Sequence, residues 1–299
     1  MEKVIIITGP TGSGKTKLSI EVAKKYNTEI INGDAYQVYK YMDILTAKIT
    51  SNETEGVRHH LFSIKDPSEE YSVAEYQQDV RSLISDFEKK NLIPLIVGGS
   101  GLYLDSVIYD YDFSKNGRSE NTETKYNELS NFELHQILEK LNSVAAAKIH
   151  MNNRKRVLRA IELAQNGTII TEFNNRLVYD PLVIFLNDAR EELYATLNDR
   201  VDEMVKNGLI EEVEKLKKMN ISKTAQKAIG YKEFLPYFNG DKNINECIEE
   251  VKKNTRHYAK RQITWFKNKP NITILDINRE NFNETIAKAF AIISDFLKK

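Results

Sequence analysis

The stretch VIIITGPTGSGKT, residues 4–16, decides the fold of this chain. Residues 4–8 form a short β-branched run, which is typical of a strand buried on both faces of a parallel sheet. Residues 9–16 follow directly and fit the pattern GxxxxGK[ST], and residues 15–26 predict a helix. A glycine-rich loop between a strand and a helix is the context that this pattern requires. The stretch therefore predicts a P-loop protein.

The composition of the loop predicts that it holds a diphosphate or triphosphate, as in ATP-binding proteins. Its glycines let backbone amides converge on phosphate oxygens, and the start of the following helix adds positive potential. Lys15 supplies a further positive charge, and Thr16 supplies a hydroxyl for Mg²⁺. The alternative is a structural glycine turn, and the loop does not identify the rest of the ligand. The expected phosphate-binding residues are Gly9, Pro10, Thr11, Gly12, Ser13, Gly14, Lys15 and Thr16.

Two further predicted strands, residues 29–32 and 92–97, also end in polar loops. Ligands of open parallel sheets bind at this carboxyl edge. Strand patterns return at residues 182–186 and 272–277, and helical patterns occupy residues 192–207, 209–219 and 283–299. We therefore expect an α/β fold, a P-loop NTPase-like parallel sheet flanked by helices.

The pattern changes between residues 111 and 176. Residues 114–124 are polar, and residues 131–141 and 153–165 have helical patterns. This organisation predicts a discontinuous core domain, residues 1–110 and 177–299, and a mostly helical insertion domain, residues 111–176.

The composition excludes several classes of protein. No apolar run approaches the roughly 20 residues that span a bilayer, and the N-terminus lacks a signal-peptide pattern, so we expect a cytoplasmic protein without membrane contact. The only cysteine, Cys247, excludes an intrachain disulfide. The net charge is zero, but residues 148–159 and 252–269 are basic runs without acids. Each run alone fits a solvated helix face; together, with interleaved aromatics, they favour a polyanionic partner.

Several strings resemble the tRNA dimethylallyltransferase family. They are NGDAYQVY at 32–39, MDILTAK at 42–48, GGSGLY at 98–103, AIGYKE at 228–233 and TRHYAKRQITWF at 255–266. The resemblance extends from residue 4 to about residue 267, whereas P-loop kinases share only the first element. Departures are Ala35 for the usual serine, Leu45 for glycine, Ile49 for proline and Ser100 for threonine.

The resemblance implies an enzyme that transfers the dimethylallyl group of dimethylallyl diphosphate to the N6 amine of the adenosine 3′-adjacent to the anticodon of tRNA. By resemblance, Asp34 is the general base, and Lys15, Thr16, Arg200 and Mg²⁺ stabilise the departing diphosphate. Otherwise Asp34 would be a turn former, and Arg200 would pair with Glu203 on a solvated helix. Residues expected to contact tRNA are Asp34, Ala35, Tyr36, Gln37, Ser100, Asn153, Arg154, Arg156, Arg256 and Arg261.

Two other functions remain open from the sequence. A P-loop small-molecule kinase would share the loop and the sheet, and would turn over ATP. A nucleotide-dependent RNA-binding protein without catalysis would not need Asp34. We expect the transferase, with the anticodon loop of tRNA and dimethylallyl diphosphate as partners and a monomer as the acting form.

Overall fold

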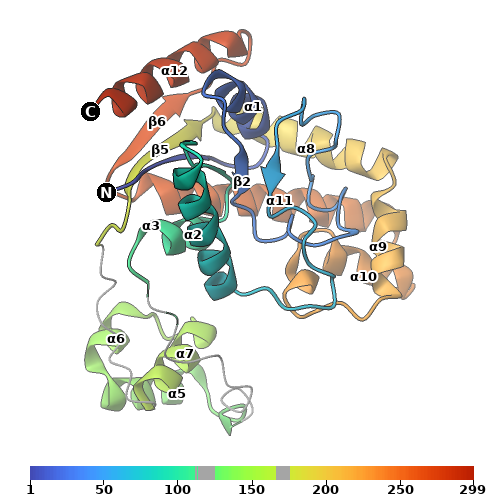
Figure 1. The fold of residues 1–299 in the computed structure, drawn as a ribbon. Helices are drawn as coiled ribbons and strands as arrows, with labels where there is room; N and C mark the ends of the chain where they lie inside the picture. The colour runs from blue at the N-terminus through green and yellow to red at the C-terminus, as the bar shows by residue number, and fades with distance from the viewer. Residues whose placement is uncertain (112, 114–124, 166–175) are drawn as a thin grey trace. The chain divides into compact units, whose positions relative to one another are not determined.

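The computed structural model describes residues 1–111, 113, 125–165 and 176–299 (Figure 1). The chain divides into two compact units, one made of Met1–Ile108 and Leu177–Lys299 and the other of Tyr109–Arg176. The polar stretch expected at 114–124 lies outside the described residues. None of the helices in the described part of the chain has the length and apolarity needed to cross a bilayer.

The first unit, as far as it is described, is built on a six-stranded sheet in which every pair of neighbouring strands is parallel. The strand order is β3-β2-β4-β1-β5-β6. The strands are β1 Lys3–Thr8, β2 Ile30–Asn32, β3 His59–His60, β4 Leu95–Val97, β5 Asp180–Asn187 and β6 Ile272–Asp276. The helices are α1 Lys15–Lys25, α2 Val73–Lys89, α3 Gly101–Ile108, α8 Arg190–Lys206, α9 Leu209–Lys217, α10 Tyr231–Phe238, α11 Ile244–Lys267 and α12 Phe282–Lys298, with a 3₁₀ turn at Ala225–Lys227. The predicted α/β fold is confirmed.

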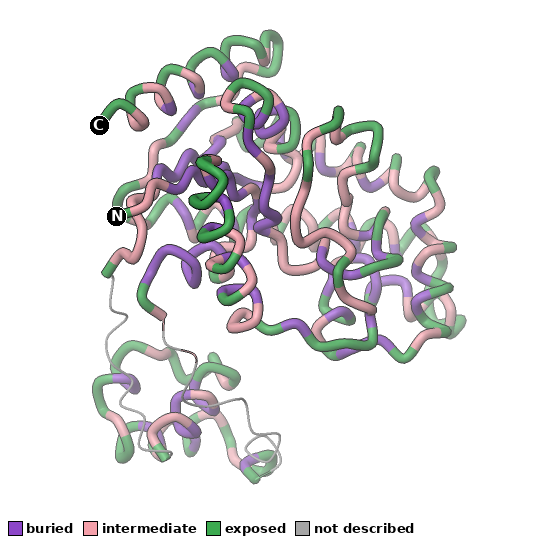
Figure 2. The backbone as a smooth tube through the Cα atoms, viewed as in Figure 1, coloured by how far each residue is buried: buried purple, intermediate pink, exposed green. Residues whose placement is uncertain are grey.

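Both faces of the sheet are covered, which explains why its strands are continuously apolar. On one face, Ile5 and Ile7 of β1 belong to a core cluster with side chains of α1 and α12. On the other face, the ring of Phe185 in β5 lies 5.8 Å from that of Phe266 in α11. The buried segments of Figure 2 accordingly follow the strands and the inward sides of these helices.

Strand β3 and helices α2, α3, α10 and α11 of the first unit were not predicted as such. Strand β3 holds only two residues, which is too short to show a period, and it pairs in parallel with β2 at the edge of the sheet. Helix α11 contains most of the basic run at residues 252–269, for which the sequence analysis predicted no secondary structure. It begins at a capping box, in which the Asn243 side chain accepts from Glu246 N and the Glu246 carboxylate accepts from Asn243 N.

The second unit is helical in its described part and has a core of its own. Its helices are α5 Asn131–Leu141, α6 Ser143–Lys148 and α7 Arg154–Gln165. Leu134 and Leu138 of α5 are fully buried against Val157 and Ile161 of α7. The spacing of these side chains, at i and i+4, forms the apolar face along which each helix packs.

Candidate active site

The carboxyl ends of β2, β4 and β1 are neighbours in the sheet and carry three loops to one place. Gly33, after β2, donates its N–H to the carbonyl of Val97 at the end of β4, over 2.7 Å. A Cβ added to Gly98 would lie 2.1 Å from the carbonyl carbon of Gly33, so only glycine allows the two loops to approach so closely. The phosphate loop after β1 completes this edge.

Lys15, at the start of α1, is folded over the phosphate loop. Its Nζ donates to the carbonyls of Gly9, at 3.0 Å, and Pro10, at 2.8 Å. Burial lowers the pKa of Lys15 to about 7, helped by the charge of Arg200 and opposed by that of Asp34. A nearby anion strongly stabilises an ammonium group whose charge is poorly solvated. The loop therefore favours the binding of an anion next to Lys15.

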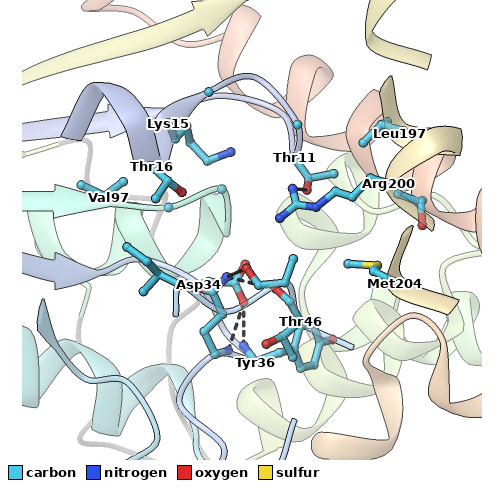
Figure 3. A pocket seen from close by; sticks show the side chains of 18 of the residues that line it. Thr11, Lys15, Thr16, Asp34, Tyr36, Thr46, Val97, Leu197, Arg200 and Met204 are labelled. Atoms are coloured by element: carbon cyan, nitrogen blue, oxygen red, sulfur yellow. Dashed lines mark hydrogen bonds between the residues drawn. The ribbon is translucent and has the colours of Figure 1, made fainter. Parts of the chain in front are cut away.

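Arg200 of α8 lies against the tip of the same loop, as Figure 3 shows. Its Nη1 donates to Thr11 Oγ1 over 3.4 Å. Burial lowers the pKa of Arg200, and Glu53 partly offsets this effect. The alternative of an ion pair with Glu203 is wrong: the described residues show no such pair, and Glu203 pairs with Lys206 at 2.7 Å. Two cations, from α1 and α8, thus converge on the loop.

Asp34 has one oxygen in the loop and another that is unengaged. Its Oδ1 accepts from the backbone N–H groups of Tyr36, at 2.8 Å, and Gln37, at 3.3 Å. Oδ2 has no hydrogen-bond partner among the described residues. Burial raises the pKa of Asp34, although the two backbone donors and Lys15 act in the opposite direction. Asp34 is thus a turn former through one oxygen and is available as a base through the other.

The charge of Asp34 acts on three phenol side chains, those of Tyr36, Tyr103 and Tyr258. Burial raises the pKa of Tyr36 to about 12, and the Asp34 charge contributes to that shift. Burial and the same charge also raise the pKa values of Tyr103 and Tyr258. The three phenols therefore stay neutral at physiological pH. Tyr36 and Tyr258 line the cavity with Asp34, whereas Tyr103 does not and donates its hydroxyl to the Tyr71 carbonyl at 3.3 Å.

The site is hollowed into a cavity of about 1070 Å³ within the first unit (Figure 3). Lys15, Thr16 and Asp34 line its polar part together with Arg200. Its apolar lining includes Leu197, Val201 and Met204 of α8, with Leu45, Ile49 and Leu209. A large cavity with a few convergent polar groups and an apolar part is the usual form of a small-molecule site.

Some expected residues support the cavity rather than line it. The Ala35 N–H donates to Ser100 Oγ at 3.0 Å, which ties the loops after β2 and β4 together. Gln37 does line the cavity, but its Nε2 is bound to the carbonyls of Thr46 and Ala47. Of the phosphate loop, the lining residues are Thr11, Gly12, Gly14, Lys15 and Thr16, whereas Gly9, Pro10 and Ser13 lie behind them.

The expected tRNA contacts fall into different settings. Arg261 of α11 is exposed and lines the cavity. Arg256, on the same helix, is half-buried and donates to Asn198 Oδ1 at 2.5 Å. In the second unit, Asn153 and Arg156 are exposed.

Arg154 is held inside the second unit, where its guanidinium donates to the carbonyls of Leu129, at 2.6 Å, and Tyr126, at 2.7 Å. These hydrogen bonds from the guanidinium to main-chain carbonyls indicate that Arg154 stabilises the fold of the second unit.

Two residues of α11 in the site were missed from the sequence. Tyr258 lines the cavity, where burial raises its pKa and the Ser100 hydroxyl acts to lower it; Gln262 accepts from the Thr11 N–H at 3.0 Å. Both residues belong to the string at 255–266 that resembles the family, and their i, i+4 spacing places them on one face of a helix.

Comparisons with known proteins identify the family. The model of the IPP transferase family matches residues 37–269. A tRNA dimethylallyltransferase of Anoxybacillus flavithermus is 47% identical over 289 residues, covering 95% of this chain and 93% of that protein. A tRNA dimethylallyltransferase of Clostridioides difficile is 42% identical over 311 residues, covering 100% of this chain and 100% of that protein.

Solved structures agree with this result. The full-length tRNA isopentenylpyrophosphate transferase of Bacillus halodurans superposes with a TM-score of 0.77 at 40% identity, covering 100% of this chain and 97% of that one. A eukaryotic dimethylallyltransferase acting on tRNA gives a TM-score of 0.84 at 31% identity, covering 100% of this chain and 80% of that one. The identity and the coverage far exceed what a shared fold alone would produce, and this chain belongs to the tRNA dimethylallyltransferase family of enzymes.

Proposed function

We propose that this chain transfers the dimethylallyl group of dimethylallyl diphosphate to the N6 amine of the adenosine 3′-adjacent to the anticodon of tRNA, the reaction of the family to which it belongs. One observation carries the proposal. Asp34, whose second carboxylate oxygen has no hydrogen-bond partner in the described part of the chain, lines the same cavity as the cations Lys15 and Arg200. A base and an anion site in one cavity are what an alkyl transfer from a diphosphate requires.

The diphosphate is held by the phosphate loop. The backbone amides of the loop and the Lys15 ammonium contact its oxygens, and Arg200 approaches from α8 on the other side of Thr11. As the bond between the allylic carbon and oxygen breaks, negative charge grows on the leaving diphosphate. These groups stabilise that charge where burial has removed competing water.

Asp34 accepts the proton of the nucleophile. The N6 amine of adenine donates its electron pair to the allylic carbon, the carbon to oxygen bond breaks, and diphosphate leaves with that electron pair. The proton released by N6 passes to Asp34 Oδ2. The raised pKa of Asp34 makes the carboxylate a stronger base than an exposed aspartate.

The apolar side chains of α8 accommodate the dimethylallyl group. Leu197 and Met204 lie on either side of Arg200 along the helix, one turn away in each direction, and line the same cavity. A hydrocarbon chain next to the departing diphosphate excludes water, which would otherwise compete with the amine as nucleophile.

The residues fit a magnesium ion bound mainly through the substrate. The Thr16 side chain is exposed in the cavity, and its hydroxyl has no hydrogen-bond partner in the described part of the chain. Mg²⁺ prefers oxygen ligands and is commonly held by one or two protein groups together with phosphate oxygens and water. Thr16 would hold the ion, which would supply positive charge next to the diphosphate.

The acceptor adenosine enters the cavity extruded from the anticodon loop, because its amine is otherwise stacked among neighbouring bases. Tyr36, Gln37 and Tyr258 line the same cavity as Asp34, which supports a role for them in holding a flipped base. Arg261, at the cavity, and Arg156, in the second unit, supply exposed charge for the phosphate backbone. We further propose that the chain acts in the cytoplasm, where tRNA is found, and that it acts as a monomer.

The proposal is tested with purified protein, labelled dimethylallyl diphosphate and bulk unmodified tRNA. We expect label to enter tRNA and to be recovered as N6-dimethylallyladenosine after digestion, with negligible ATP hydrolysis. Phosphoryl transfer from ATP to a small acceptor in the absence of tRNA would overturn the proposal in favour of a kinase.

A further inference from the structure

Gln262 connects the phosphate loop to the loop after β4. It lies on α11 and is 5% exposed. Its Oε1 accepts from the backbone N–H of Thr11 at 3.0 Å, and its Nε2 donates to the carbonyl of Gly99 at 3.0 Å. Both hydrogen-bonding groups of one buried amide are therefore used on two loops of the site.

The Thr11 contact matters because Thr11 is the point at which Arg200 meets the loop. The Thr11 N–H is occupied by Gln262, so it is the Thr11 side chain that faces the cavity and accepts from Arg200. Glycines at positions 9 and 12 flank this segment and allow its two ends many conformations, although Pro10 fixes its own φ. A bond from a helix at Thr11 removes that freedom before any substrate binds.

The fit around the Gln262 amide is tight. A Cβ added to Gly99 would lie 2.1 Å from Gln262 Nε2, a distance that no two such atoms can keep. The next nearest atom to that Cβ, apart from the same side chain, is the Gly9 carbonyl oxygen at 3.2 Å. Any side chain at residue 99 must therefore displace Gln262 first.

We propose that Gln262 is a positioning residue for the diphosphate. It holds Thr11 so that the loop amides and Arg200 are already arranged for the leaving group, and binding then costs less ordering. The inference rests on the proposed assignment of the loop to the diphosphate. Gln262 does not itself contact the reacting atoms.

The test compares the full chain with Gln262→Met, which keeps the length of the side chain and removes both hydrogen bonds. We expect kcat/KM for dimethylallyl diphosphate to fall about ten- to a hundredfold, mainly through KM, because small displacements of positioning groups have effects of this order. The KM for tRNA should change far less. Gln77→Met is the matched control, since Gln77 is also buried and its Nε2 donates to the Ser106 carbonyl at 2.7 Å, away from the cavity. It should lower the melting temperature and leave both KM values unchanged.

A double-mutant cycle separates positioning from packing. Gly99→Ala should reproduce the KM defect by displacing the Gln262 amide, and it also supplies the test if Gln262→Met fails to fold. In a Gln262→Ala background the methyl group of Ala at position 99 finds space, so it should cost little more. If the fold-changes in KM caused by the two single substitutions simply multiply in the double variant, the inference is overturned.

Lys15→Ala tells apart the two ways in which the inference can fail. If Lys15→Ala raises the KM for the diphosphate and Gln262→Met does not, the positioning role of Gln262 is overturned alone. If Lys15→Ala leaves that KM unchanged, the loop does not hold the diphosphate, and both the proposed function of the loop and this inference are overturned.

Discussion

Replacing Asp34 with asparagine separates the proposed role of Asp34 as a base from its role in forming the turn. Oδ1 is the atom that accepts from Tyr36 N and Gln37 N, and asparagine keeps a carbonyl oxygen in that position. The substitution changes only the second oxygen, which has no partner among the described residues, into an amide that cannot accept the proton. The loop should therefore keep its conformation while the proposed base is lost.

The expected size of the effect follows from this separation. A positioned base contributes about 10² to 10⁴ in rate, and about 3 to 5 kcal/mol of the barrier, so the turnover rate should fall by that factor. Affinity for tRNA should change far less, because the turn and the cavity wall remain.

Stability should move in the opposite direction to activity. Because burial raises the pKa of Asp34, the folded state binds this proton more tightly than the unfolded state. Ionised Asp34 therefore costs stability at every pH above its unfolded pKa, and the cost is fully present once the pH exceeds the raised folded pKa. At pH 7 the neutral asparagine variant should melt at the parent temperature or above it.

The assay is single-turnover transfer with both substrates saturating, measured beside a melting curve. A role as base predicts slow chemistry in a fully folded protein, whereas a role limited to the turn predicts lower melting with normal chemistry in the folded fraction. If the folded asparagine variant reacts within a few-fold of the parent, Asp34 is not the base.

Three further predictions concern the charges of the site. Lys15→Ala should raise the KM for dimethylallyl diphosphate and lower kcat in initial-rate assays, and two unchanged constants would refute the loop assignment. For the parent, kcat/KM for the diphosphate should fall as pH rises above about 7, where Lys15 loses its proton, and Arg200→Gln should move that fall to higher pH by removing a neighbouring charge. If kcat/KM of the Arg200→Gln variant falls at the same pH as that of the parent, this prediction is contradicted. Replacing Arg156 and Arg261 with glutamine should flatten the salt dependence of tRNA binding in filter assays, whereas Arg154→Gln should instead lower the melting temperature. An unchanged salt slope would show that the two exposed arginines do not contact phosphates.

The sequence alone determines the phosphate loop, the sheet edge and the place of Asp34. These features are local, because a buried parallel strand is a short apolar run and the loop after it begins at its carboxyl end. A strand and the polar residues that follow it lie within a few positions of each other. Strand β3 escaped prediction because two residues show no period.

Only the tertiary structure decided how distant segments complete the site. Arg200 meets Thr11 across 189 positions of sequence and Gln262 meets it across 251, and no local pattern carries such a pairing. The sequence left Arg200 between an ion pair with Glu203 and the site; in the fold Arg200 contacts Thr11, and Glu203 pairs with Lys206. The sequence likewise assigned Arg154 and Arg156 the same role in tRNA binding. Only the fold shows that the Arg154 guanidinium binds main-chain carbonyls and that Arg156 is exposed. The physical reason is that hydrogen-bond partners of a long side chain depend on which helix packs beside it, and the three-dimensional fold alone determines that.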